Sequence, residues 1–220
     1  MRHPIQQQRV DRSELASMIS RMGVCASASA LNQLTVYLDM LCRWNAVMNL
    51  VGPRRWQDIL TDLVVDSFFL AEFMEDLPLP GSPLCWDVGA GAGLPGIPLR
   101  MLWTRGVYHM VEAREKRALF LSNVLAQLRL SETYVFRGMA ERFFATQARP
   151  ADAVLSRAFM PWRQLVDFVQ NRMQPEGILV VMSLEPAPVV LPEPWRVLRQ
   201  DAYMTDGGER YFWALMTDGE

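Results

Sequence analysis

A glycine-rich run follows a short apolar segment near the middle of the chain. The apolar residues Leu84-Cys85-Trp86 precede the run Asp87-Val88-Gly89-Ala90-Gly91-Ala92-Gly93-Leu94-Pro95-Gly96, which is rich in glycine. Glycine permits positive φ angles and lets a ligand approach the backbone where a Cβ atom would clash. Proline suits the first turn of a helix because its missing N–H would be unpaired there. The order strand, glycine-rich turn, helix predicts a nucleotide-type site at the carboxyl end of a strand.

The spacing of the glycines distinguishes between nucleotide ligands. A dinucleotide fingerprint has its third glycine at the position of Leu94, whereas here it comes one residue earlier, at Gly93. The tighter spacing favours S-adenosylmethionine, which has no pyrophosphate and whose carboxylate can face the start of a helix near Pro95. About twenty residues on, Glu112 ends the next apolar run and can accept the ribose hydroxyls. The alternative is a plain strand-to-helix turn followed by a solvated glutamate.

Composition limits the class of protein. The chain has 220 residues, half of them hydrophobic, and a formal net charge of −2. The charge excludes a globally basic nucleic-acid binder but allows a local basic patch. Three widely spaced cysteines and two histidines predict a reduced, cytoplasmic protein without a metal site. No segment approaches the roughly 18 apolar residues of a membrane helix, so no membrane association is expected.

The periodic segments predict two parts. Residues 11–73 have a helical pattern that is broken at 49–53, and residues 77–83 form a proline-rich linker. Strands are then expected at 84–88, 107–111, 134–136, 153–156 and 178–182, helices at 95–103, 114–128 and 162–173, and a hairpin at 195–216. This order predicts an α/β fold with a doubly wound, mostly parallel sheet and a C-terminal antiparallel hairpin, as in Rossmann-like class I methyltransferases. An N-terminal helical extension, 1–76, and the S-adenosylmethionine-dependent domain, 77–220, are expected to form one compact unit.

Short motifs spread over nearly the whole chain carry a resemblance to a known family. They are Arg43-Trp44-Asn45 with Asn49-Leu50, Asp66-Ser67, the run from Asp87 to Leu99, Lys116-Arg117 with Phe120-Leu121, Ala140-Glu141, Ser156-Arg157-Ala158, and Gly207-Gly208-Glu209-Arg210. With these motifs the chain resembles the GidB/RsmG family, whose members methylate N7 of a guanine in bacterial small-subunit (16S) rRNA. The resemblance implies an S-adenosylmethionine-dependent enzyme whose partner is small-subunit rRNA or the ribosomal particle.

The resemblance also implies the cofactor-binding residues. Gly89 and Leu94 would contact the cofactor from the turn, Ala140-Glu141 would flank its adenine, and Arg157 would lie beside its methionine. The last two motifs come directly after the third and fourth expected strands, which places them at the same sheet edge as the glycine turn. Without the family, Glu141 could equally be a helix-start charge. Arg157 could be a surface arginine, but a functional role is favoured because ligands bind at that edge of the sheet. The predicted cofactor set is Gly89, Gly91, Leu94, Glu112, Ala140, Glu141 and Arg157.

Two motifs of other nucleic-acid methyltransferases are absent from the sequence. It has no Asn/Asp-Pro-Pro-aromatic motif, which argues against an exocyclic amine as target, and no Pro-Cys pair for cytosine C5 chemistry. Guanine N7 needs neither, because its lone pair lies in the ring plane and no proton must leave before attack. Catalysis can then depend mainly on positioning. No catalytic general base is therefore predicted.

Arginine and aromatic residues are the candidates to hold RNA. Asn49, Arg54 and Arg55 lie in the break between the two helical stretches and are the predicted substrate contacts, although the two arginines could equally be solvated charges. The further candidates are Arg43, Arg157 and Arg163, with Trp44, Trp56 and Phe159 able to stack on a base or fill the core. For Trp44, on an apolar helical stripe, the core is favoured.

The chain departs from the family pattern near the expected substrate face. Asp62 and Leu63 stand where the family often has Arg-His, and Ser183-Leu184 where it often has lysine and glycine. These departures and the acidic net charge leave two alternatives open. One is a methyltransferase acting on a small molecule or a protein, and the other is a non-enzymatic module that retains the fold. A monomer is favoured, but the sequence does not fix the oligomeric state.

Overall fold

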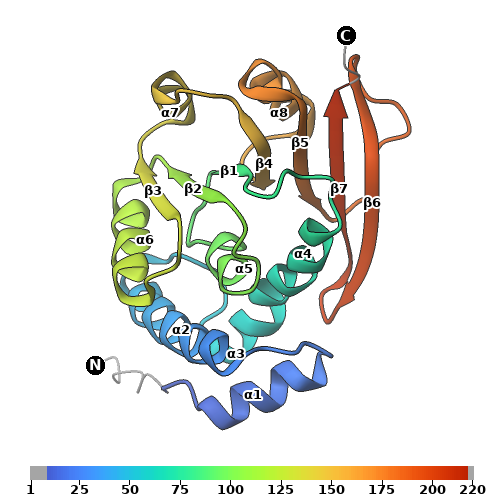
Figure 1. Cartoon of the computed structure of the whole chain (residues 1–220). Coiled ribbons are helices and arrows are strands. Elements are labelled where there is room, and N and C mark those ends of the chain that lie inside the picture. Colours follow the sequence, from blue (N-terminus) through green and yellow to red (C-terminus); the bar gives the residue numbers. More distant parts are fainter. Residues whose placement is uncertain (1–8, 218–220) are drawn as a thin grey trace.

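A seven-stranded sheet forms the centre of the protein in the computed structural model, which describes residues 9–217 (Figure 1). Its strand order is β3-β2-β1-β4-β5-β7-β6. The strands are β1 Leu84–Val88, β2 Val107–Glu112, β3 Thr133–Arg137, β4 Ala151–Arg157, β5 Met173–Ser183, β6 Trp195–Thr205 and β7 Gly208–Thr217. Strands β1 to β5 pair in parallel, whereas β7 is antiparallel to β5 and β6. The predicted doubly wound sheet with a C-terminal antiparallel hairpin is confirmed.

Helices cover both faces of this sheet. They are α1 Arg12–Arg21, α2 Ala28–Met48, α3 Trp56–Ile59, α4 Val65–Glu75, α5 Gly96–Leu102, α6 Glu115–Leu128, α7 Ala140–Thr146 and α8 Trp162–Val169. Successive strand residues point to opposite faces. Cys85 thus belongs to the hydrophobic cluster that contains residues of α1 to α6, and its neighbours Leu84 and Trp86 belong to the cluster that contains residues of α7 and α8. Because both faces are covered, β1 is buried along its whole length.

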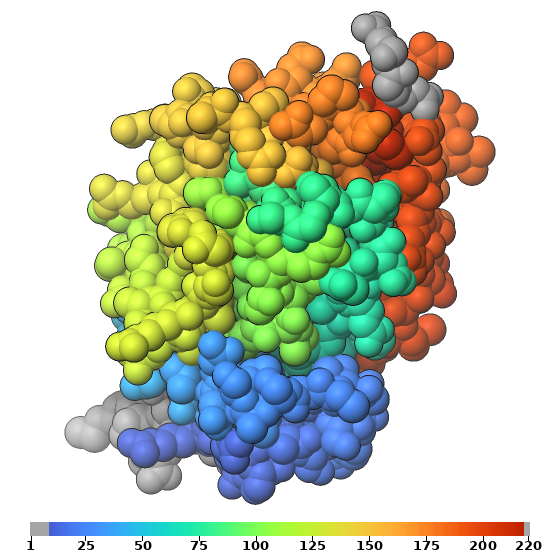
Figure 2. Space-filling model, viewed as in Figure 1, coloured from blue at the N-terminus to red at the C-terminus, as the bar shows by residue number. Residues whose placement is uncertain are grey.

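The N-terminal helical extension packs against the glycine-rich turn. Ser27 caps α2 through its side chain, and further along that helix the Tyr37 hydroxyl donates to the Ala92 carbonyl at 2.9 Å. On α4, the Ser67 hydroxyl donates to the Pro95 carbonyl at 3.1 Å. Figure 2 shows the N-terminal helices directly against the α/β part. The extension thus braces the turn. The boundary at residue 76 stays a prediction, and residues 1–8 of the extension lie outside the described residues.

Two of the expected helices differ in detail from the prediction. The second helical stretch, which follows the break at 49–53, contains a π-helical segment, Leu60–Val64, between α3 and α4. The helix expected at 162–173 is too long, because α8 ends at Val169 and, after a short 3₁₀ turn, β5 begins at Met173. The restriction that Pro175 places on Gln174 acts beyond this end. Instead, Met173 pairs with Ala151 of β4, a long-range contact that the local pattern does not show.

Candidate active site

The glycine-rich turn between β1 and α5 needs its glycines for conformational reasons. Gly89, Gly91 and Gly93 have φ angles of 75°, 61° and 80°, a region that side chains with a Cβ rarely adopt. The N–H groups of Gly89 and Ala90 both donate to the Val111 carbonyl, at 2.9 and 3.1 Å. These bonds hold the turn against the end of β2. The conformational role predicted for the glycines is therefore confirmed.

Glu112, the last residue of β2, lies beneath this turn. Its side chain is buried, with 5% of the residue exposed. One carboxylate oxygen accepts a hydrogen bond from Gly91 N–H at 2.9 Å, and the other accepts from Arg114 N–H at 2.7 Å. Each oxygen keeps a second lone pair, so the fixed carboxylate can still accept two hydroxyl protons from a ligand. The alternative of a solvated glutamate is wrong.

A cavity of about 270 Å³ opens above Glu112 at the carboxyl ends of the strands. It is lined by Gly89, Val111, Glu112, Ala113, Arg114, Arg117, Gly138, Met139, Ala140, Ala158 and Phe159. The Phe159 side chain packs on the turn, because a Cβ atom added to Gly89 would lie 2.6 Å from its ring. The cavity lies where the strand order reverses between β1 and β4, the position at which doubly wound sheets bind their ligands.

The structure brings some of the predicted cofactor residues together in this cavity and places the others around it. Gly89, Glu112 and Ala140 line it. Gly91 is joined to Glu112 by its N–H, and the Leu94 side chain is buried in the core beside the turn. Glu141 is exposed in the first turn of α7. Contact of these residues with a cofactor stays a prediction.

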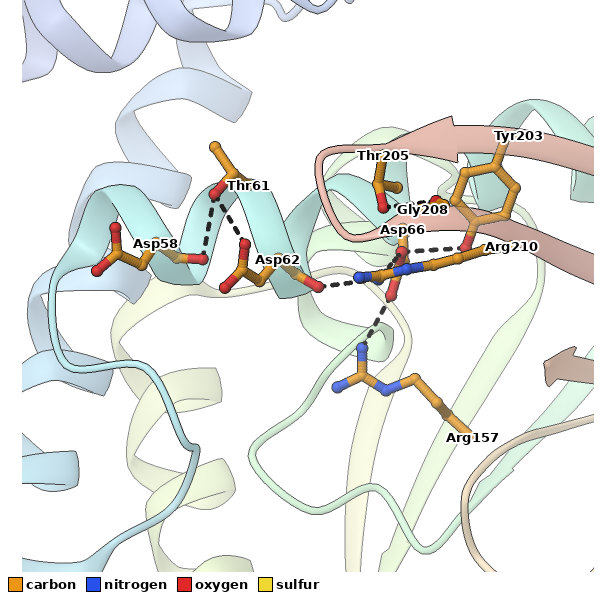
Figure 3. Close-up of polar contacts among 9 residues, drawn as sticks. All are labelled: Asp58, Thr61, Asp62, Asp66, Arg157, Tyr203, Thr205, Gly208 and Arg210. Carbon is orange, nitrogen blue, oxygen red and sulfur yellow. Dashed lines mark hydrogen bonds and ion pairs between the residues drawn. The ribbon is translucent and has the colours of Figure 1, made fainter. Parts of the chain in front are cut away.

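Arg157, at the end of β4, points into a polar network around Asp66 (Figure 3). Its Nη1 lies 3.2 Å from Asp66 Oδ2. The other carboxylate oxygen, Oδ1, accepts hydrogen bonds from Arg210 Nη1 at 2.6 Å and from the Tyr203 hydroxyl at 3.0 Å. Arg210 Nη1 also donates to the Asp62 carbonyl at 2.9 Å. The sequence singled out the Asp66-Ser67 and Arg210 motifs but assigned neither of them a role.

Asp87 is a second buried carboxylate that the sequence analysis left without a role. Burial raises the pKa of Asp87 to about 7, against the lowering effects of Tyr108 and of the positive charge of Arg157. Its Oδ2 has no hydrogen-bond partner among residues 9–217. A Cβ atom on Gly96 would lie 2.5 Å from this oxygen, so the carboxylate abuts the start of α5. The sequence signal that could have identified Asp87 is its place as an aspartate in the otherwise apolar strand before the glycine turn.

The predicted RNA contacts gather in the loop between α2 and α3. Asn49 ends α2 in the left-handed conformation, with a φ angle of 50°. Arg54 is exposed, but its guanidinium donates to the Asn45 carbonyl at 2.8 Å and to Asn49 Oδ1 at 2.6 Å. The Arg54 side chain therefore braces the loop, and its contact with a substrate stays a prediction. Arg55 is exposed beside it.

The other RNA candidates divide between core and surface. Trp56 is 1% exposed and belongs to the core, and Trp44 packs against Phe120 with ring centroids 5.5 Å apart, as favoured for it. The exposed Arg163 lies over the Trp162 ring at 4.4 Å. Arg43 is exposed and donates to a backbone carbonyl of its own helix. Among the three aromatic candidates, Phe159 lines the cavity.

Comparison with known proteins identifies the family. Residues 30–185 match the family model GidB, described as rRNA small subunit methyltransferase G. The chain belongs to the GidB family. Ribosomal RNA small subunit methyltransferase G of Nitratidesulfovibrio vulgaris is 53% identical over 206 residues, 94% of each chain. The protein of that name from Oleidesulfovibrio alaskensis is 45% identical over 215 residues, 93% of each chain.

Solved structures with low sequence identity share the fold of this GidB protein. An O-methyltransferase from Bacillus cereus in complex with SAH superimposes with a TM-score of 0.62 at 14% identity, covering 94% of this chain and all of that one. A mutant MtNAS in complex with S-adenosylmethionine has a TM-score of 0.58 at 13% identity, covering 94% of this chain and 77% of that one. The methyltransferase-like Rossmann fold predicted from the sequence is confirmed.

The described part of this GidB protein has neither a membrane-spanning helix nor a metal-binding cluster of side chains. Across residues 9–217, no helix is both long and apolar enough to cross a membrane. Within the same residues, no three His, Cys, Asp or Glu side chains gather in a way that could hold a metal ion.

Proposed function

We propose that this GidB-family protein transfers a methyl group from S-adenosylmethionine to N7 of a guanine in bacterial small-subunit rRNA. Family membership and the names of the relatives support the reaction and its substrate. The observation that carries the proposal for this chain is the arrangement of Glu112. Its carboxylate is fixed by two backbone N–H groups at the floor of the cavity, directly beside the positive-φ glycine turn.

The residues of the cavity fit this cofactor. Glu112 retains the lone pairs to accept the two ribose hydroxyl protons in charge-assisted hydrogen bonds. Gly89 lines the cavity and, lacking a Cβ atom, lets the Phe159 ring lie against the turn. A backbone N–H at Ala140 can meet a ring nitrogen of adenine. When bound, S-adenosylmethionine supplies an electrophilic methyl group on a positively charged sulfur. Gly91, Leu94 and Glu141 complete the proposed cofactor site from the turn and from α7.

The protein needs to position the guanine rather than to remove a proton from it. The N7 lone pair is already available, so alignment with the methyl group supplies most of the rate enhancement. Phe159 offers an aromatic surface at the cavity on which a base can stack. Arg157 is paired with Asp66, so the positive charge of Arg157 is partly neutralised beside the positively charged sulfur of the methyl donor. Buried Asp87 lies close enough to Arg157 for the charge of Arg157 to lower the pKa of Asp87.

The substrate is held outside the cavity by a local basic surface. Arg55, supported by the loop that Arg54 and Asn49 brace, is the proposed phosphate contact. The net charge of −2 means that such a local contact must replace general attraction. The protein is proposed to act as a monomer in the bacterial cytoplasm, without a metal ion, on small-subunit rRNA or on the assembled particle.

A methyl-transfer assay with purified components tests this function. The protein is incubated with methyl-labelled S-adenosylmethionine and small-subunit particles or free 16S rRNA from cells that lack it, and the nucleosides are identified by mass spectrometry. Label in 7-methylguanosine is expected. Label that enters ribosomal proteins or small molecules while the rRNA stays unlabelled contradicts the proposal and favours the alternative substrates. No transfer together with no cofactor binding favours the non-enzymatic alternative.

A further inference from the structure

The structure assigns a positioning role to Asp66. We propose that its carboxylate, shared between Arg157, Arg210 and Tyr203, holds the Arg157 guanidinium in place beside the reaction zone. The inference rests on the proposed methyl transfer. Asp66 itself does not touch the substrate or the cofactor in this proposal and acts through Arg157.

Three elements that are distant in the sequence meet at this carboxylate (Figure 3). Asp66 is on α4, in the first turn after the π-helical segment, and its side chain is 5% exposed. Arg157 comes from β4, while Tyr203 and Arg210 come from the hairpin strands β6 and β7. The ion pairs are therefore largely removed from water, where electrostatic attraction between charged groups is stronger than at the surface.

The hairpin fixes the orientation of the carboxylate. Arg210 and Tyr203 both hold Oδ1, which leaves Oδ2 to face Arg157. Arg210 is itself anchored by the backbone carbonyl of Asp62. Tyr203 is packed between Phe69 and Phe212, with ring centroids 4.8 and 4.5 Å away. Burial and the charge of Asp66 raise the pKa of Tyr203, so its hydroxyl stays a donor at every physiological pH.

The orientation of Arg157 matters because this residue directly precedes the wall of the cavity in the chain. Ala158 has a φ angle of 54°, and the next residue, Phe159, lines the cavity and packs on Gly89. The ion pair with Asp66 thus fixes the last residue of β4 immediately before the cavity wall. Loss of the ion pair would release the Arg157 guanidinium, and the start of the Phe159 loop would then shift with it.

Replacement of the carboxylate by its isosteric amide tests the role. In Asp66→Asn the amide carries one oxygen, so it cannot accept from Arg157 and Arg210 in the present geometry. The kcat for rRNA methylation is expected to fall by about 10- to 100-fold, the scale of a misplacement of about 1 Å. The Kd for S-adenosylmethionine, measured by calorimetry, is expected to change by less than about twofold, because the ribose and adenine contacts remain. Asp58→Asn is the matched control, since it removes the same charge from the same helical run. The contact drawn at Asp58 runs from Thr61 to its backbone carbonyl, and its carboxylate takes no part in the ion pairs of Asp66 (Figure 3).

A double-mutant cycle separates positioning from a structural role. If Asp66 acts through Arg157, the double variant Asp66→Asn/Arg157→Ala has the kcat of Arg157→Ala alone. If Asp66 only supports the fold, the two losses multiply and the proposal is overturned. Tyr203→Phe removes one donor to the same carboxylate and serves if Asp66→Asn does not fold. Its smaller fall in kcat should also vanish in the Arg157→Ala background.

The activity of the wild-type protein distinguishes a failure of the positioning role of Asp66 from a failure of the proposed function. If the wild type methylates rRNA and Asp66→Asn is equally fast, the positioning role is wrong and the proposed function stands. If the wild type leaves rRNA unmethylated, the proposed function fails, and the role of Asp66 fails with it. A wild type that methylates, with a slow Asp66→Asn and no added loss in the double variant, is the result that we expect.

Discussion

Glu112→Gln is the substitution whose effect can be worked out most fully. The carboxylate accepts one backbone N–H on each oxygen, from Gly91 at 2.9 Å and from Arg114 at 2.7 Å. Glutamine replaces one of these oxygens with an NH₂ group, so one N–H loses its acceptor and faces another donor. The hydroxyls of the cofactor ribose lose the negative charge and one acceptor. Hydrogen bonds to charged groups contribute about 1.5–3 kcal/mol each, and we expect cofactor binding to weaken by roughly 1–3 kcal/mol, or about 5- to 150-fold in Kd.

Isothermal calorimetry with S-adenosylmethionine measures this effect, and thermal unfolding shows whether the variant is folded. Glu115→Gln is the control, because the Glu115 carboxylate forms an exposed ion pair with Arg137 at the start of α6, which contributes little. Its affinity should match the wild type, and neither form should bind NADH. A folded Glu112→Gln protein with wild-type affinity would show that the carboxylate is not a cofactor ligand. NADH binding to the wild type would refute our interpretation of the glycine spacing.

Three further predictions test the turn, the buried aspartate and the RNA contact. Gly93→Ala should lower the free energy of unfolding by about 1–3 kcal/mol in urea titrations, because the added Cβ atom would lie 2.9 Å from a Leu121 methyl carbon. Gly81→Ala, where the added Cβ atom meets open space, should leave the free energy of unfolding unchanged. The pKa of Asp87 is about 7 in the folded protein against 3.8 ordinarily. The contribution of Asp87 to stability is therefore complete below about pH 4 and is lost as the pH rises to 7. Asp87→Asn should remove this fall in stability, and an unchanged pH profile of stability would contradict the assignment. Arg55→Ala should weaken RNA binding and reduce the slope of log K against log salt by about 0.7, the value for one single-strand phosphate contact, and equal slopes would exclude that contact.

The sequence predicted the parts of the site that depend on local structure. The glycine turn and Glu112 could be located because each lies at the end of an apolar strand, and parallel strands bring such residues to one edge. The doubly wound, mostly parallel sheet and the terminal hairpin followed from the alternation of segments. The boundary between α8 and β5 was missed because Met173 pairs with Ala151 of β4, and a local helical pattern does not show such a contact.

The sequence did not predict which side chains that are distant in the chain pair with one another. Asp66 meets partners 91, 137 and 144 residues away in the chain, and no periodicity or spacing connects residues at such separations. The same holds over a shorter distance for Arg54, whose guanidinium donates hydrogen bonds to the Asn45 carbonyl and to the Asn49 side chain at the end of α2. Exposure could be predicted for this arginine, but the hydrogen bonds that hold it could not.

The most direct test of the central claim is to map 7-methylguanosine in small-subunit rRNA from cells with and without this protein. Chemical cleavage at 7-methylguanosine, read by sequencing, gives the position and the extent of modification. We predict one modified guanine that disappears when the protein is absent and returns when the wild-type protein is supplied, with a lower extent for Glu112→Gln. An identical 7-methylguanosine pattern in both strains would contradict the account.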